Sequence, residues 1–169
     1  MENKTALIII EECFKNLNLA IEVFQNFLSA RTSSDTTDHY QGLSYLDKGK
    51  TLYKDSLGEI SKIIGFVPTD ASPAFRQWKA GYLEKIGILS RNTEFERLRS
   101  ELQNDDLLLK FLTAEEINIL LVKHFESQQT GKRKLEYMKA RMLFDKLQSL
   151  IEDAESLSIR SKERIYQQR

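Results

Sequence analysis

The stretch "ALIIIEECFKNLNLAIEVFQNFL", residues 6–28, decides the fold. Its large apolar residues recur at alternating steps of three and four, which is the spacing of a helix face that packs lengthwise on another helix. The residues on this seam are Leu7, Ile10, Phe14, Leu17, Ile21, Phe24 and Leu28. The pattern predicts one long helix from about residue 3 to about residue 31.

A second seam follows the polar run "TSSDTTD", residues 32–38, which is typical of a connection whose aspartates cap the next helix. Its members are Leu43, Leu46, Tyr53, Leu57, Ile60, Ile64 and Val67, with Lys50 in the gap between Leu46 and Tyr53. The two seams predict an antiparallel hairpin of long helices. Four glycines each weaken the second helix by roughly 1 kcal/mol relative to alanine, which indicates close backbone approach or a break. They are Gly42, Gly49, Gly58 and Gly65.

The rest of the chain also carries helical signals. Ser72 and Pro73 favour a helix start ahead of Trp78 and Tyr82, and shorter helices are expected around Phe95 to Leu102 and Leu107 to Leu112. A capping box at Thr113 and Glu116 begins a further helix that runs to about Phe125. The apolar face of a final long helix contains Leu135, Met138, Met142, Leu143, Leu147, Leu150, Ala154 and Leu157.

These signals predict an all-α helical bundle with two long N-terminal helices, a cluster of short central helices and a long C-terminal helix. With 169 residues, 41% of them hydrophobic, the chain can build one sizeable core. We expect a single helical domain over residues 1–169, in which residues 1–67 form the hairpin and residues 72–169 the central and C-terminal helices.

The amino-acid composition limits which binding partners and which cellular location are expected. The 25 basic residues balance 25 acidic ones, so no overall field attracts nucleic acid or an anionic membrane. The apolar stretch "ALIII" at residues 6–10 is too short to span a bilayer, so no membrane partner is expected. Cys13 is the single cysteine and sits among apolar neighbours, which indicates a buried thiol and a reducing, cytoplasmic location.

Motifs for catalysis or metal binding are missing from the sequence. His39 and His124 have no Cys, His or acidic partner at ligand spacing, so we expect surface or edge histidines, no metal and no cofactor. No Gly-rich phosphate loop or nucleophile elbow is present. An enzyme would therefore need a site assembled from distant segments.

A basic cluster crowds the start of the final helix. Its members are Lys132, Arg133, Lys134, Lys139 and Arg141. Cations are disfavoured there because the helix dipole makes the N-terminal end positive, so the cluster needs a counter-charge. Two explanations are open. The cluster pairs with the acidic stretch of residues 94–116 in the same molecule, or it binds an anionic partner such as nucleic acid or an acidic protein surface.

Two short stretches raise the alternative of DNA binding. "EISKIIGF", residues 59–66, and "AGYLEKIGIL", residues 80–89, resemble the supporting helix and the end of the recognition helix of winged-helix proteins. The resemblance implies that Arg76, Gln77 and Lys79 contact the DNA groove. However, the intervening "VPTDASPAFRQWK" is longer than the usual turn and helix, and "SRNTEFERLRSEL", residues 90–102, predicts a helix and not a two-stranded wing.

The favoured function is therefore a non-enzymatic, cytoplasmic helical interaction or regulatory module that binds another protein, which could be a second copy of the chain. A DNA-binding regulator that reads through residues 56–89 is the alternative. An enzyme with a site not visible in the sequence ranks third.

Overall fold

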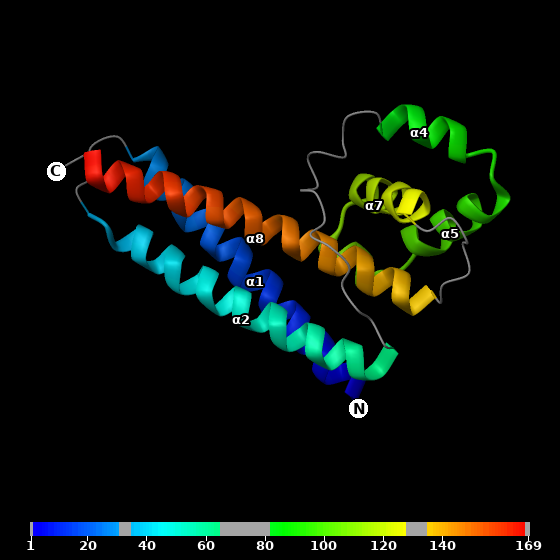
Figure 1. Cartoon of the computed structure of the whole chain (residues 1–169), viewed down its shortest axis with the longest axis horizontal. Coiled ribbons are helices and arrows are strands. Elements are labelled where there is room, and N and C mark those ends of the chain that lie inside the picture. Colours follow the sequence, from blue (N-terminus) through cyan, green and yellow to red (C-terminus); the bar gives the residue numbers. More distant parts are fainter. Residues whose placement is uncertain (1, 31–34, 65–81, 128–134, 168–169) are drawn as a thin grey trace. The chain divides into compact units, whose positions relative to one another are not determined.

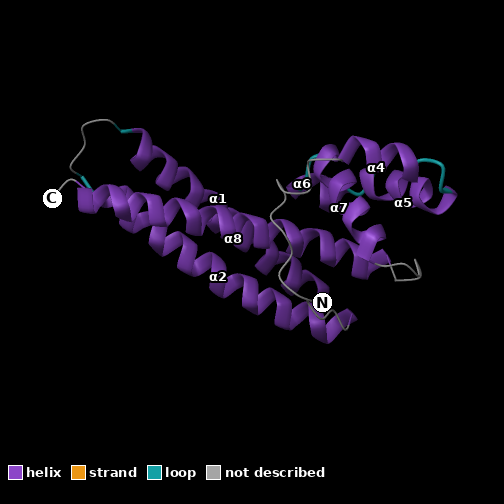
Figure 2. Ribbon diagram, turned by 45° about the horizontal axis from the view of Figure 1, so that its top comes forward, coloured by secondary structure: helices purple, strands orange, loops and turns teal. Residues whose placement is uncertain are grey.

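The structure, a computed structural model, describes residues 2–30, 35–64, 82–127 and 135–167. In these ranges every regular element is a helix and none is a strand (Figure 2). The helices are α1 (Glu2–Ser29), α2 (Thr37–Ile64), α4 (Tyr82–Leu89), α5 (Thr93–Gln103), α6 (Asp106–Phe111), α7 (Ala114–Ser127) and α8 (Leu135–Gln167). The all-α fold is confirmed, with two long N-terminal helices, short central helices and a long C-terminal helix.

The chain divides into two compact units. The hairpin unit comprises Met1–Gly65 together with Leu150–Arg169, and the central unit comprises Phe66–Ser149. The division falls inside α8, so residues 135–149 of this helix belong to the central unit and the remainder to the hairpin unit. None of the described helices is both long enough and apolar enough to cross a membrane.

In the hairpin unit, α1, α2 and the C-terminal part of α8 lie side by side (Figure 1). The seam predicted for α1 is confirmed, because Ile10, Phe14, Leu17 and Phe24 are all buried. The end of α8 is tied to the end of α1 by Arg164, whose guanidinium donates hydrogen bonds to the carbonyl oxygens of Phe27 and Ala30. These bonds satisfy carbonyls that a helix C-terminus leaves without partners inside the helix.

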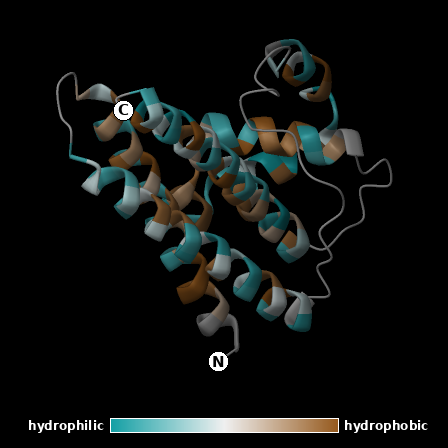
Figure 3. Ribbon diagram, turned by 60° about the vertical axis from the view of Figure 1, so that its left-hand side comes forward, coloured by the Kyte–Doolittle hydropathy of each residue, from teal (hydrophilic) through white to brown (hydrophobic). Residues whose placement is uncertain are grey.

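The seam of α2 lies in a different register from the one predicted. Its buried positions are His39, Gly42, Leu46, Gly49 and Ser56, whereas Leu43, expected on the seam, is 38% exposed. The prediction was wrong at Leu43 because it followed large apolar residues, while the helix contacts its neighbour mainly through small ones. Apolar residues still alternate with polar ones along the long helices, as amphipathic packing requires (Figure 3).

The glycines of α2 confirm close approach at two positions. A Cβ atom on Gly42 would lie 2.5 Å from Cε1 of Phe24, and one on Gly49 would lie 2.6 Å from Cδ2 of Leu17. Real Cβ atoms do not approach other carbons this closely, so a larger residue would require the Phe24 or Leu17 side chain, or the helices themselves, to shift. Gly58 instead faces open space. Gly65 and Val67 lie outside the described residues.

Cys13 is fully buried on α1, as predicted, and its thiol donates a hydrogen bond to the carbonyl oxygen of Gly49 at 3.2 Å. Burial raises the pKa of the Cys13 thiol from 9.0 to about 12. Because the thiolate is the nucleophile, we expect iodoacetamide at pH 8 to alkylate the native protein far more slowly than the urea-unfolded protein. Mass spectrometry of timed samples measures both rates. Equal rates would show that the thiol is exposed and reactive.

In the central unit, side-chain caps fix the helix starts. The side chain of Asn92 accepts hydrogen bonds from the backbone N–H groups of Glu94 and Phe95, which begins α5. At α7 the backbone N–H of Thr113 donates to Glu116 Oε1, and that of Glu116 donates to Thr113 Oγ1, each at 3.1 Å. The predicted capping box is therefore confirmed. The predicted apolar residues of α5, Phe95, Leu98 and Leu102, are buried.

Candidate functional site

Six of the eight predicted site residues lie outside the described residues: Arg76, Gln77, Lys79, Lys132, Arg133 and Lys134. The other two, Lys139 and Arg141, are in the first turns of α8 and belong to the central unit. Both make intramolecular ion pairs. Lys139 Nζ lies 2.5 Å from Asp105 Oδ2, and Arg141 Nε lies 3.4 Å from Asp145 Oδ1.

The pair between Lys139 and Asp105 agrees with the intramolecular explanation of the basic cluster. Burial alone would raise the pKa of Asp105, but hydrogen bonds from Lys139 and from the backbone N–H of Leu108 lower it below its usual value. Asp105 also caps α6 through its bond with Leu108. One carboxylate thus serves as a helix cap and as the counter-charge of Lys139.

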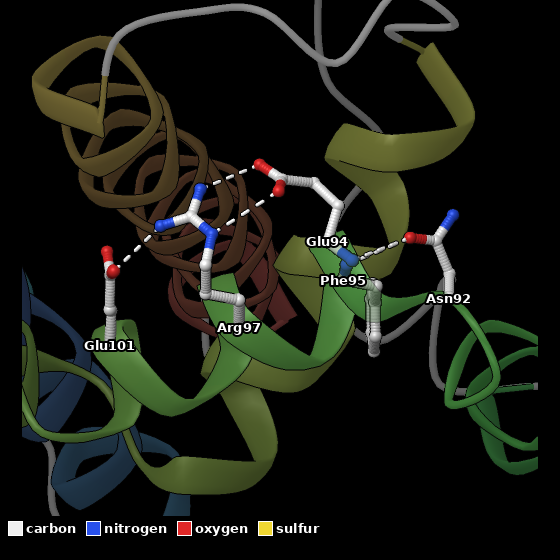
Figure 4. Close-up of polar contacts among 5 residues, drawn as sticks. All are labelled: Asn92, Glu94, Phe95, Arg97 and Glu101. Carbon is white, nitrogen blue, oxygen red and sulfur yellow. Dashed lines mark hydrogen bonds and ion pairs between the residues drawn. The ribbon is translucent and has the colours of Figure 1, made fainter.

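Other acidic residues of the 94–116 stretch pair elsewhere. Arg97 bridges two of them on its own helix, with Nη2 2.7 Å from Glu94 Oε1 and Nη1 2.8 Å from Glu101 Oε1 (Figure 4). Glu116 bonds Lys146 of α8 in addition to its role in the capping box. Among the described members of the basic cluster, Lys139 pairs with the acidic stretch at Asp105, while Arg141 pairs with Asp145 on its own helix.

The segment after α4 differs from a winged-helix protein. A turn at Ser90 and Arg91 leads directly to the Asn92 cap and α5, so the helix predicted for residues 90–102 is confirmed. The strand that the resemblance implies after Leu89 does not occur within residues 82–127. Gly87 lies in the last turn of α4.

Both histidines are buried, which corrects the prediction of surface or edge positions. His39 is 4% exposed, and its Nδ1 lies 2.7 Å from the hydroxyl oxygen of Ser161 on α8. The rings of Phe24 and Phe27 pack against it at centroid distances of 6.0 Å. His124 is 5% exposed. No group of three His, Cys, Asp or Glu side chains in the described ranges is arranged to hold a metal ion.

In many hydrolases a histidine acts as the base that activates a serine nucleophile, so the contact between His39 and Ser161 has to be tested against the enzyme hypothesis. However, Ser161 has no exposed surface, and a nucleophile must reach its substrate. Burial lowers the pKa of His39 below its usual value, and the charge of Lys162 lowers it further. The pair therefore functions as a buried, uncharged polar contact that joins α2 to α8.

A groove of about 450 Å³ lies above this contact, between the start of α2 and the end of α8 in the hairpin unit. Three lining residues come from the first turns of α2: His39, Tyr40 and Leu43. Five come from the last turns of α8: Ser158, Ile159, Lys162, Ile165 and Tyr166. Its base is held in place by the His39–Ser161 contact and by Arg164, which anchors the same end of α8 to α1.

The groove gathers apolar side chains that are open to solvent. Seven large apolar side chains are exposed among the described residues, and four of them line this groove. Tyr40, Ile159 and Tyr166 are each 59% exposed, and the fourth is Leu43. Exposed apolar residues scattered singly need no explanation, whereas these four border one groove.

No protein-family model matches the chain, and no curated protein or solved structure is significantly similar to it. The groove therefore has to be interpreted from its own residues.

The prediction from sequence missed this groove, although two signals pointed to it. The apolar spacing of the last helix continues beyond Leu157, through Ile159 and Tyr166. His39 also precedes Gly42 and Leu46 by three and seven residues, which places it on the same helix face as both. That the two faces meet follows only from the packing of α2 against α8.

Proposed function

We propose that this chain is a non-catalytic protein-interaction module and that the groove between α2 and α8 is its binding surface. One observation carries the proposal: four of the seven exposed large apolar side chains in the described part of the chain border a single groove. Covering such a patch with a partner removes apolar area from water, which is the main source of affinity in most protein association.

The chemistry of the groove favours binding over catalysis. Its titratable lining groups are a neutral histidine, a lysine and two tyrosines, with no carboxylate among the described lining residues. Ser161, which contacts the histidine, is buried, and the lining Ser158 donates its hydroxyl hydrogen bond to the carbonyl oxygen of Glu155. Nothing in this set pairs an accessible nucleophile with a base, whereas an apolar groove between two helices suits a helical segment of a partner protein.

The substitution Ile159→Gln tests the proposal, because it removes one apolar anchor but keeps a good helix former. We expect it to weaken partner binding about 10-fold or more, from the area that an isoleucine side chain buries. Ile8→Gln is the matched control, since Ile8 is 61% exposed on α1 of the same unit but does not line the groove.

The wild type and both variants, each full length and tethered to a support, would be exposed to extract from cells that express the chain, one portion treated with nuclease and one untreated. Mass spectrometry should find at least one protein retained by the wild type and by Ile8→Gln but lost with Ile159→Gln. Circular dichroism would check that all three remain folded. Retention of the same proteins by all three forms would refute the groove as the binding surface. Retention that disappears on nuclease treatment would favour the DNA-binding alternative.

A further inference from the structure

We infer that the occupant of the groove is an amphipathic helix of a partner protein with a carboxylate opposite Lys162. This inference rests on the proposed function and adds the chemistry of the partner.

The groove carries one permanent charge. Among its described lining residues, Lys162 is the only one that is charged at neutral pH, because His39 is held neutral by burial and by the neighbouring lysine. Lys162 is exposed, and its Nζ lies 5.9 Å from the centroid of the Tyr166 ring. The cation is therefore at the edge of the apolar patch, held over an aromatic face.

Unlike Lys50 and Lys139, Lys162 has no ion-pair partner among the described carboxylates. Lys50 pairs with Glu155 at 3.7 Å in the same unit, and Lys139 pairs with Asp105 in the central unit. No described carboxylate lies within ion-pair distance of Lys162. A lone cation beside an apolar patch selects a partner that supplies the opposite charge and rejects one that supplies a second cation.

The lining positions suit a helix. Ile159, Lys162 and Tyr166 follow one another at steps of three and four on α8, and Tyr40 and Leu43 are three apart on α2. The groove is thus bounded by one face of each of two neighbouring helices. A further helix packs into such a groove by ridges-into-grooves contact, which would add a fourth helix beside α1, α2 and α8.

A second copy of the chain is a poorer occupant. A two-fold symmetric contact across this groove would bring together two copies of Lys162 and no carboxylate from the described lining residues, and an uncompensated excess of like charge opposes association. A partner helix with a carboxylate avoids this repulsion and neutralises the cation. The groove is therefore better matched by an acidic partner helix, and self-association through it would contradict the inference.

Three fluorescein-labelled peptides of about 18 residues, or five helical turns, provide the probe. All carry leucines at positions i, i+3, i+4 and i+7, and they differ only in one residue beside this stripe: Glu, Gln or Lys. Anisotropy titration with the full-length protein should show the Glu peptide bound about 3–10-fold tighter than the Lys peptide at low salt. The preference should shrink at high salt, because exposed charges are screened.

Charge reversal then assigns the preference to one side chain. Lys162→Glu should reverse the order of the Glu and Lys peptides. Lys48→Glu is the matched control on α2, since Lys48 is exposed and does not line the groove, and it should keep the wild-type order. Equal binding of the three peptides, no detectable binding of any, or an order unchanged by Lys162→Glu would overturn the inference.

Two further results separate this inference from the function on which it rests. If a protein retained by the wild type is lost with Ile159→Gln but the peptides show no charge preference, the groove is a binding surface and the inference of an acidic partner helix is wrong. If sedimentation shows a dimer that Ile159→Gln dissociates, the occupant is a second copy. If the Ile159→Gln variant retains the same extract proteins as the wild type, the proposed function itself fails.

Discussion

Replacing Asp145 by alanine should lower the free energy of unfolding by about 3–5 kcal/mol. The Asp145 side chain is only 8% exposed and receives two cations, with Lys123 Nζ at 3.2 Å and Arg141 Nε at 3.4 Å. The Lys123 side chain is 6% exposed, so water cannot replace the lost carboxylate. Removing one member of a buried ion pair is among the costly changes a core can suffer. Urea unfolding of the full-length chain, followed by circular dichroism, measures the effect.

Two control variants test the cause of this loss. Lys123→Met should cost less than Asp145→Ala, because Asp145 keeps Arg141 and the methionine fills much of the same volume. Glu94→Ala should cost at most about 1 kcal/mol, since its pair with Arg97 is exposed to solvent. If Asp145→Ala proved no more damaging than Glu94→Ala, the buried cluster would contribute nothing special to stability.

Gly42→Ala and Gly58→Ala should change stability in opposite directions, although both replace a glycine inside α2. Alanine at Gly42 places its Cβ 2.5 Å from the ring of Phe24, which is fully buried and cannot move aside freely. We expect a net loss of about 2 kcal/mol from this overpacking. Alanine at Gly58 meets no atom within 4 Å, so the higher helix propensity should give a gain of up to about 1 kcal/mol. Thermal and urea unfolding measure both.

A double-mutant cycle with Phe24→Leu checks that the ring causes the loss. The smaller, more adaptable leucine leaves room for the alanine methyl, so the pair Phe24→Leu and Gly42→Ala should be less harmful than the sum of its members by about 1 kcal/mol or more. Strict additivity would mean that the clash with Phe24 is relieved by some other movement, and the close approach of α1 and α2 would need another explanation.

The long helices were predictable because their signals are local. The spacing of Ile10, Phe14, Leu17 and Phe24 gave both the helix and its buried face, and all four are buried. The capping box at Thr113 and Glu116 was equally readable, since both partners lie within one turn. A pattern that depends on residues three or four apart needs no knowledge of the rest of the fold.

The register of α2 could not be obtained in the same way. Large apolar residues suggested a seam through Leu43, while the structure buries Gly42, Gly49 and Ser56. Small residues carry little hydrophobic signal, yet they allow Phe24 and Leu17 of α1 to pack against the α2 backbone. Which face of α2 is buried thus depends on the shape of its neighbour as much as on its own hydrophobicity.

The ion pairs of the basic cluster also depended on tertiary packing. The sequence showed a surplus of cations near the start of the last helix but not their counter-charges. For Lys139 the structure supplies Asp105, 34 positions earlier in the chain, whereas Glu94 and Glu101 are taken by Arg97 on their own helix. Short-range pairs compete with long-range ones, and only the folded arrangement decides which form.

By itself, the sequence determined the all-α class, the long helices at both ends of the chain and the buried thiol of Cys13, because helix periodicity and apolar neighbours act over a few residues. Only the tertiary structure decided that His39 is buried against Ser161, 122 positions later, and that Tyr40 and Tyr166 line one groove. No local pattern encodes that meeting. It arises because α2 and α8 pack against the same α1 helix, and the side chains left outside their contact form the groove.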